Sequence, residues 1–176
     1  ATLCRESLAL SREVGSAVEQ GDALTRLGQA LAALGQEDEA ISTYEEALAL
    51  RRELGQTNRA LEPLAGLARL ALAQERVEEA LVYVDEIWDF LQDNNLTGVV
   101  QPFLVYLTCY EVLQANADER ATAVLKDAYQ LLHDQAARID DEAARQAFLE
   151  NVAAHRQIAM YNTRYDSFSQ RNHSKN

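Results

Sequence analysis

The chain has 176 residues, of which 48% are hydrophobic, with two prolines and seven glycines. This length suits one domain with a sizeable core, and the abundance of Ala, Leu, Glu, Gln and Arg predicts an all-α fold. The formal net charge of −12 excludes a general nucleic-acid surface, because phosphate binding needs clustered Lys and Arg.

Neither a membrane span nor a secretion signal is expected. The longest strongly apolar run, residues 103–107, is far shorter than the roughly 20 residues that cross a bilayer, and the amino terminus lacks a basic segment followed by an apolar core. Cys4 and Cys109 fall on apolar helical positions outside any CxxC pair, which predicts buried thiols in a reducing compartment. These features predict a cytoplasmic protein without membrane contact.

The chain repeats itself at a nearly constant period. Residues 5–15 superimpose without a gap on residues 45–55. A pattern of small residues around a larger apolar one recurs twice more at almost the same interval, at Ala40, Tyr44 and Ala47, then Ala80, Val84 and Ile87, then Ala121, Leu125 and Ala128. This spacing lets two antiparallel helices approach closely, so each period predicts one helical hairpin.

The repeat divides the chain into a half unit and three predicted hairpins. A half unit at residues 1–20 precedes hairpins at about 21–57, 58–98 and 99–139. Asp22 is expected to cap the first helix of the first hairpin, and Gly35 to end that helix in a left-handed conformation. Pro63 and Pro102 are expected in the first turns of later helices, where proline is tolerated.

Turn residues separate the later elements. The cluster Asp93–Gly98 is expected to connect two hairpins, and Asp118 to cap the second helix of the third hairpin. A closing helix is expected at 140–162, starting at Asp140–Glu142 and covering the apolar end of the stack. Residues 163–176 are polar and lack a helical period, which predicts a disordered tail. Tyr165 and Phe168 are the side chains of this tail that could dock on the folded part.

The first complete unit resembles the tetratricopeptide repeat (TPR). Its signature spacing is matched by Leu24, Leu27, Gly28, Leu31, Gly35, Ala40, Tyr44 and Ala47. The second unit matches less well, and the third is weaker still, through Val105, Cys109 and Val112. The usual first aromatic is replaced by Leu24, Leu64 and Val105, and the period is longer than the family's usual one. The resemblance implies a right-handed α-solenoid like the long-helix TPR arrays of bacterial signalling ATPases and transcriptional regulators.

The resemblance also implies a concave groove that binds a partner. The positions that line it in the family correspond here to Thr25, Gln29 and Ala32, then Glu62, Ala65, Arg69 and Leu72, then Phe103, Tyr106, Tyr110 and Gln114. Tyr106 and Tyr110 lie four positions apart and therefore share a helical face that suits a peptide. The alternative is that these aromatic residues pack against the closing helix and the tail.

Catalysis is not expected. His133, His155 and His173 lie at no metal-ligand spacing, and phosphate-binding, nucleophile-elbow and zinc-protease motifs are absent from the sequence. No cofactor or metal is therefore expected. The sequence predicts a non-enzymatic scaffold or regulatory sensor module, a fragment of a larger multi-domain protein, that binds a peptide or protein segment in its groove.

The alternative function is a structural spacer or self-association module. The opening half unit carries Leu3, Leu8, Leu10 and Val14 without the helix that should cover them. An exposed apolar end invites a second copy, so a homo-oligomer is the expectation of this alternative. A small-ligand sensor has no specific residue signal.

Overall fold

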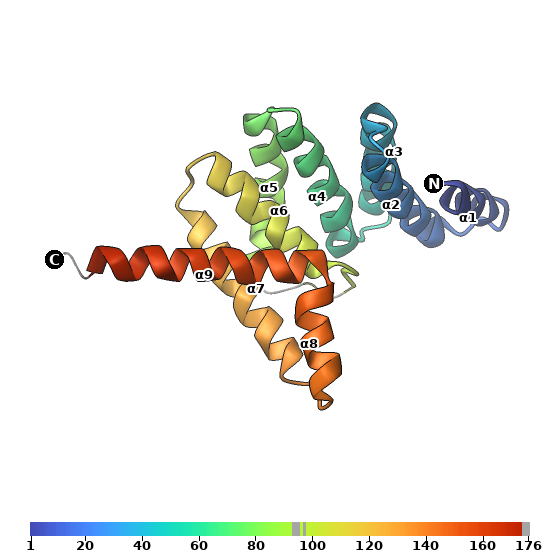
Figure 1. Cartoon of the computed structure of the whole chain (residues 1–176). Helices are drawn as coiled ribbons and strands as arrows, with labels where there is room; N and C mark the ends of the chain where they lie inside the picture. The colour runs from blue at the N-terminus through green and yellow to red at the C-terminus, as the bar shows by residue number, and fades with distance from the viewer. Residues whose placement is uncertain (93–95, 97, 174–176) are drawn as a thin grey trace. The chain divides into compact units, whose positions relative to one another are not determined.

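The computed structural model describes residues 1–92, 96 and 98–173, and over 166–173 the backbone alone. Within these residues the chain forms only helices, which confirms the all-α prediction (Figure 1). The helices are α1 (Thr2–Glu13), α2 (Ala17–Ala33), α3 (Glu37–Glu53), α4 (Thr57–Ala73), α5 (Val77–Gln92), α6 (Pro102–Ala115), α7 (Arg120–Ala136), α8 (Glu142–Asn151) and α9 (Ala153–His173).

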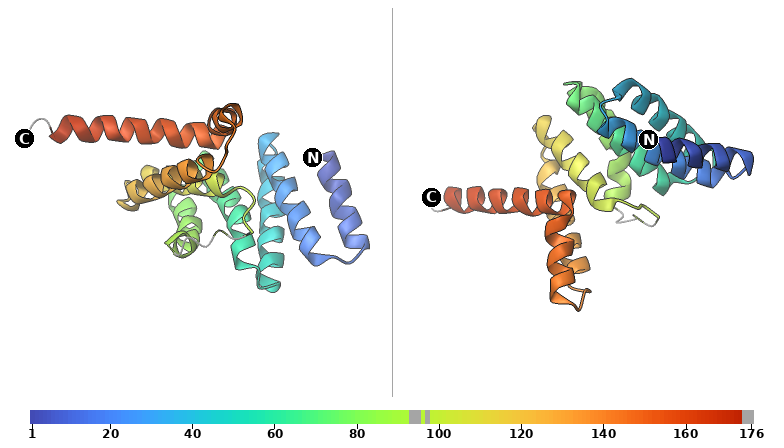
Figure 2. Two further views of the ribbon diagram at one scale, coloured as in Figure 1. Left: turned by 90° about the horizontal axis from the view of Figure 1, so that it is seen from below. Right: turned by 45° about the vertical axis from the view of Figure 1, so that its right-hand side comes forward.

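The chain divides into two compact units, Ala1–Pro102 and Phe103–Asn176, which we call unit 1 and unit 2. The division falls within the residues for which the sequence predicted one domain. Unit 1 holds α1 to α5, each packed antiparallel on the next, and α2 also contacts α4 (Figure 2). Its complete hairpins, α2–α3 and α4–α5, start one repeat period apart, at Ala17 and Thr57.

Left-handed residues end the helices of unit 1. Gly15, Gly35 and Gly55 have φ values of 71°, 72° and 64°, a backbone conformation that glycine adopts without steric cost. The N–H of Gln36 donates to the Leu31 carbonyl at 3.0 Å and closes the turn beyond Gly35. Glu75, one repeat period after Gly35, adopts φ 59° without being glycine.

Some predicted helix starts were wrong. Asp22 does not cap α2, because the helix begins at Ala17 after Ser16, and Pro63 lies inside α4 rather than in its first turn. The first turns of both helices, residues 17–20 and 57–60, carry no regular apolar pattern in the sequence, which hid them. Pro102 does begin α6. Of the predicted connector Asp93–Gly98, residues 93–95 and 97 lie outside the described residues.

The core of unit 1 consists of the repeated small and large apolar positions. Ala40, Tyr44, Ala80, Val84 and Ile87 are fully buried. On the outer surface, ion pairs link successive second helices at equivalent positions, Arg12 with Glu46 at 2.6 Å and Arg52 with Glu86 at 2.7 Å. Such exposed pairs contribute less than about 1 kcal/mol each, so burial of the apolar positions stabilises the stack.

Unit 2 begins with α6 and α7, joined by a turn in which Asp118 accepts from the Arg120 N–H at 2.9 Å. Asp141 caps α8 by accepting from the Ala144 N–H at 2.7 Å. The closing segment is two helices rather than the predicted one, because Val152 is extended. The buried His155 ring donates from Nδ1 to the Phe148 carbonyl at 2.7 Å across this corner.

Helix α9 continues to His173, through most of the predicted tail. Ile158 and Asn162 are buried, and Tyr161 and Tyr165 are partly buried, on one face at helical spacing. The Lys126 ammonium lies 5.5 Å from the Tyr165 ring. This packing explains why the helix persists beyond residue 162; the Phe168 side chain lies outside the described residues. Among those described, no helix is both long and apolar enough to cross a membrane.

Candidate functional site

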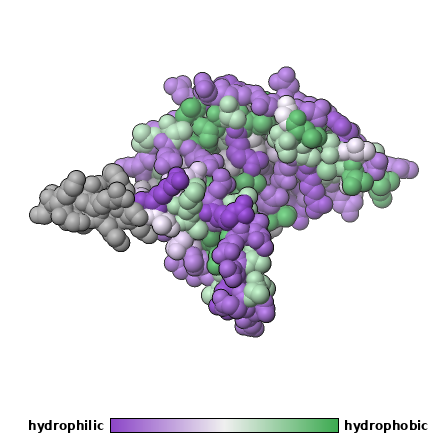
Figure 3. Space-filling model, in the orientation of Figure 1, coloured by the Kyte–Doolittle hydropathy of each residue, from purple (hydrophilic) through white to green (hydrophobic). Residues whose placement is uncertain are grey.

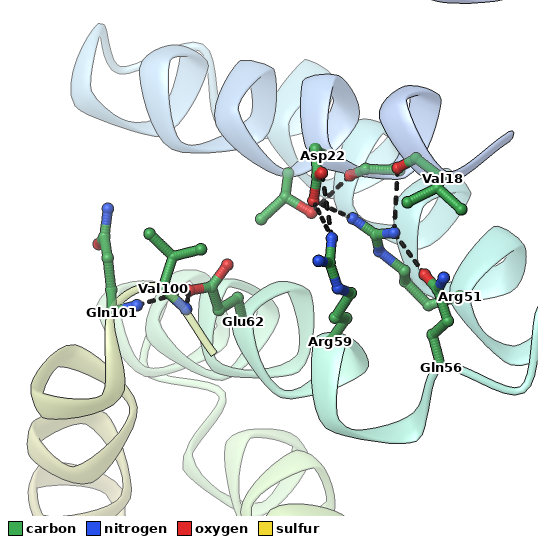
Figure 4. A network of polar contacts seen from close by, with 10 residues as sticks. Val18, Asp22, Arg51, Gln56, Arg59, Glu62, Val100 and Gln101 are labelled. Carbon is green, nitrogen blue, oxygen red and sulfur yellow. Dashed lines mark hydrogen bonds and ion pairs between the residues drawn. The ribbon is translucent and has the colours of Figure 1, made fainter. Parts of the chain in front are cut away.

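The first helices of the two complete hairpins, α2 and α4, present a polar surface in unit 1. A network of ion pairs and hydrogen bonds holds them together and links α4 to the segment before α6, and Figure 4 shows its residues. Because α2 and α4 lie in contact, polar residues one repeat apart come together on this surface. We call it the α2/α4 face.

Asp22 is the centre of one half of the network. Its carboxylate forms an ion pair with Arg51 of α3 and accepts from Nη1 of Arg59, at the start of α4, at 3.0 and 3.1 Å (Figure 4). The Arg51 side chain is only 2% exposed and also donates from Nη1 to the Val18 carbonyl at 3.1 Å. A buried guanidinium needs such partners, since an unpaired buried charge costs several kcal/mol.

Gly21 makes room for the Arg51 guanidinium. A Cβ at this position would lie 2.6 Å from Cζ of Arg51, closer than any real contact. The sequence analysis did not reveal this buried role of Arg51. The glycine inside the helical pattern of α2 was the available signal, because such a glycine often marks a close approach.

Glu62 performs the equivalent task one repeat later. It stands one repeat period after Asp22, and its Oε1 accepts from the backbone N–H groups of Val100 and Gln101 at 2.8 and 2.7 Å. The Gln101 amide donates to the Gln29 Oε1 at 3.4 Å. Both carboxylates thus tie a first helix to the beginning of the next hairpin.

Tyr44 fills the space between α2 and α4. A Cβ at Gly28 would lie 2.7 Å from its ring, and one at Gly66 would lie 2.6 Å from Cε2 of its ring. Burial raises the pKa of Tyr44 to about 12, and the nearby Arg69 guanidinium offsets part of that rise. Arg69 is half-buried and forms no ion pair with any described residue, so its charge is available on this surface.

The predicted groove residues of unit 1 fall into two groups. Thr25 is 4% exposed and its hydroxyl donates to the Gly21 carbonyl at 2.8 Å, so it does not reach the surface. Gln29, Glu62 and Arg69 are partly exposed on the α2/α4 face. Of the remaining positions, Ala65 is buried, whereas Ala32 and Leu72 are half-buried.

The aromatic residues predicted in the third hairpin are buried. Phe103 packs edge-on against Phe148 and His155, with ring centroids 6.2 and 4.4 Å away, and Tyr106 is 2% exposed. Tyr110 packs against Tyr161, with centroids 5.0 Å apart. Phe103 and Tyr110 thus pack against the closing helices, which was the alternative weighed from the sequence.

Part of Tyr110 still borders a pocket within unit 2. The pocket has a volume of about 320 Å³ and lies between α6 and α9. Gln114 is exposed at its edge and donates to the Tyr110 hydroxyl at 2.9 Å. The residues that complete it are Tyr161, Arg164 and Tyr165. The sequence pointed to Tyr165 as a docking residue but missed Tyr161 and Arg164, because the polar residues of α9 between them mask the helical period.

The described residues contain no group of three or more His, Cys, Asp or Glu side chains that could hold a metal ion. Cys109 is fully buried, and burial raises the pKa of its thiol to about 12. The two surfaces described above carry paired charges in unit 1 and aromatic edges in unit 2.

Comparison with known proteins gives one family match. Residues 19–87 match the family model described as tetratricopeptide repeat. This span covers most of α2, all of α3 and α4, and most of α5. No curated protein and no solved structure gives a significant match to the chain.

Proposed function

Residues 19–87 form tetratricopeptide repeats, and from this premise we propose that the chain is a non-enzymatic scaffold that binds a peptide or protein segment on the α2/α4 face. Repeats of this family generally mediate protein–protein interaction. The observation that carries the proposal is Arg69, a partly exposed cation on that face that forms no ion pair with any described residue.

The neighbours of Arg69 favour an acidic or amide-bearing segment. A guanidinium binds a carboxylate through charge-assisted hydrogen bonds. Gln29 is half-exposed on α2, and among the described residues its side-chain oxygen accepts only the long hydrogen bond from Gln101, at 3.4 Å. Asp22 and Glu62 are already occupied within the stack, so the ligand meets a cation and an amide there.

A peptide library displayed against the full chain tests this proposal. The bound peptides are then measured against Arg69→Gln and against Arg76→Gln, a control arginine that pairs with Glu79 outside the α2/α4 face. The proposal requires at least about a tenfold loss for Arg69→Gln, equal to about 1.4 kcal/mol, and no loss for the control. Equal affinities for both variants would contradict it.

The pocket of unit 2 is a second contact surface for the same class of partner. Exposed Gln114 and the edges of Tyr110 and Tyr165 combine a hydrogen-bonding amide with aromatic area, a combination typical of peptide sites. Gln114→Ala and Arg164→Gln are expected to weaken a peptide that uses this pocket. Neither substitution alters a buried side chain, so unchanged affinity would remove this surface from the proposal.

The regulatory part of the proposal rests on the resemblance to the arrays of bacterial signalling ATPases and transcriptional regulators. A repeat scaffold in a cytoplasmic regulator would convert partner binding into a change in a neighbouring domain. Partner-dependent activity of a protein that carries this chain tests that role. An activity that is the same with Arg69→Gln as without it would contradict the role.

Self-association is the second candidate function. Leu3 and Leu10 of α1 and Val14 at its end are 80%, 61% and 75% exposed. Exposed apolar residues on a protein surface are usually scattered singly, so a cluster of them marks a contact surface. Sedimentation velocity across a hundredfold concentration range distinguishes the candidates. A chain that stays monomeric throughout removes this one, and a dimer broken by Leu10→Arg supports it.

A further inference from the structure

A groove between α1 and α2 borders the α2/α4 face and shares Asp22 with it. Its volume is about 420 Å³, and hydrophobic residues gather on the surface over the amino-terminal helices at the right of Figure 3. Leu3, at 80% exposure, and Val14, at 75%, are among the most exposed large apolar residues described. The groove is lined among others by Leu3, Leu10 and Val14 of α1 and by Glu19, Ala23 and Arg26 of α2.

The repeat shows what such a groove accommodates. Helices α1 and α2 correspond to α3 and α4 after a shift of one repeat period, and α2 itself contacts both α3 and α4. Its Asp22 reaches Arg51 on one wall and Arg59 on the other (Figure 4). The α1/α2 groove therefore has the arrangement of a site that one helix fills one repeat later.

The charges of the two grooves differ. The positions of Arg51 and Arg59 are taken in the α1/α2 groove by Ser11 and Glu19. If a helix filled the α1/α2 groove as α2 fills the groove between α3 and α4, its residue equivalent to Asp22 would face the Glu19 carboxylate. A basic residue at that position is therefore the electrostatic complement of the groove. Glu19 forms no ion pair with any described residue, and Glu6, which also lines the groove, forms none either.

The sizes of the wall residues also differ. The ring of Tyr44 and the guanidinium of Arg51 force glycine at positions 28 and 21 of the helix that packs on them. Their counterparts in the α1/α2 groove are Cys4 and Ser11, which are much smaller. On the α2 wall Arg26 stands at the place of Gly66, so the added room lies on the α1 wall beside Cys4 and Ser11, where side chains larger than glycine would bury more apolar area.

We propose that the α1/α2 groove binds an amphipathic helix of a partner protein, with a basic residue facing Glu19 and side chains larger than glycine facing Cys4 and Ser11. A second copy of the chain is the weaker candidate, because it presents the same hollow and the same carboxylates rather than a helix to fill them. The inference goes beyond the α2/α4 face, since it concerns the side of α2 that packs on α1 and a helical ligand.

The probe is a peptide of residues 17–33 with Gly21→Ala, Asp22→Arg and Gly28→Ala, stapled on its solvent face because isolated helices of this length are marginal in water. Fluorescence anisotropy measures its affinity for the full chain. We expect it to bind at least about tenfold more tightly than a matched peptide that keeps Asp22, a difference of about 1.4 kcal/mol. Glu19→Arg in the chain is expected to reverse this order.

Glu19 lies in the first turn of α2, where negative charge favours the helix, so Glu19→Gln provides a milder variant that should abolish the preference. Leu10→Arg should abolish binding. Val82→Arg, at a 66% exposed valine of α5, and Arg69→Gln should leave it unchanged. No binding, equal affinity for both peptides, or insensitivity to Leu10→Arg would overturn the proposal. So would a dimer that Leu10→Arg breaks and that excludes the probe, because the occupant would then be a second copy.

Discussion

Replacing Gly66 by alanine tests whether the close packing of Tyr44 stabilises the stack. Alanine normally stabilises a helix interior by about 1 kcal/mol relative to glycine. At Gly66 the added Cβ would lie 2.6 Å from Cε2 of the fully buried Tyr44 ring. The ring cannot move aside toward α2, because the backbone of Gly28 lies so close that a Cβ added there would be 2.7 Å from the ring.

The expected magnitude follows from these two opposing effects. Overpacking of a tight core costs about 1–3 kcal/mol, and a ring held on both faces places Gly66→Ala at the upper end. After the gain in helix propensity, the net loss in free energy of unfolding is about 2 kcal/mol. With a slope of about 2 kcal/mol per molar urea, the midpoint should fall by about 1 M.

The fluorescence of Trp88, the single tryptophan, is the appropriate measurement, because this residue lies in α5 of unit 1 with Gly66. Tyr44→Leu removes the ring, so Gly66→Ala in that background should stabilise by about 1 kcal/mol instead. A rise in the urea midpoint for Gly66→Ala alone, or the same change in both backgrounds, would refute the proposed contact.

Four further predictions concern stability, titration and thiol reactivity. Glu75→Gly should stabilise unit 1 by about 1 kcal/mol in the same urea assay, because the residue adopts φ 59°; a lower midpoint would contradict this. Asp22→Asn should cost about 2 kcal/mol, since Arg51 loses its charge partner but keeps neutral acceptors; an unchanged midpoint would refute the network. Burial favours neutral Tyr44, so stability present below pH 10 should be lost between pH 10 and about 12, and less so in Tyr44→Phe. Cys109, with its thiol pKa raised to about 12, should resist a thiol reagent at pH 8, while the half-buried Cys4 should react.

The hairpins of unit 1 were predictable because their signals are local and repeat. Small residues at Ala40 and Ala47 around Tyr44 specify a close helix pair, and the recurrence of this pattern one period later gives the number and order of elements. Helix starts were less predictable. The first turns of α2 and α4 carry no regular apolar pattern, so only the capping residue or the repeat register could reveal them.

The buried polar contacts depend on residues distant in sequence, which explains why the sequence did not reveal them. Arg51 is 33 residues from its acceptor Val18, and its burial depends on the absence of a side chain at Gly21. Gly66 was overlooked in the same way. In both cases a glycine inside a helical pattern was the observable sign of a close contact.

Comparison of equivalent positions separates structural carboxylates from those available to a ligand. Asp22 and Glu62 stand one repeat period apart, and each accepts from the beginning of the following hairpin, through a side chain in one case and backbone N–H groups in the other. A carboxylate at this position thus links a first helix to the segment that follows its hairpin, whether the donor is a side chain or a backbone N–H. Glu19 stands where Arg59 would supply that donor, and it forms no ion pair with any described residue. Its free charge, like that of Arg69, is therefore where recognition by another chain should be sought.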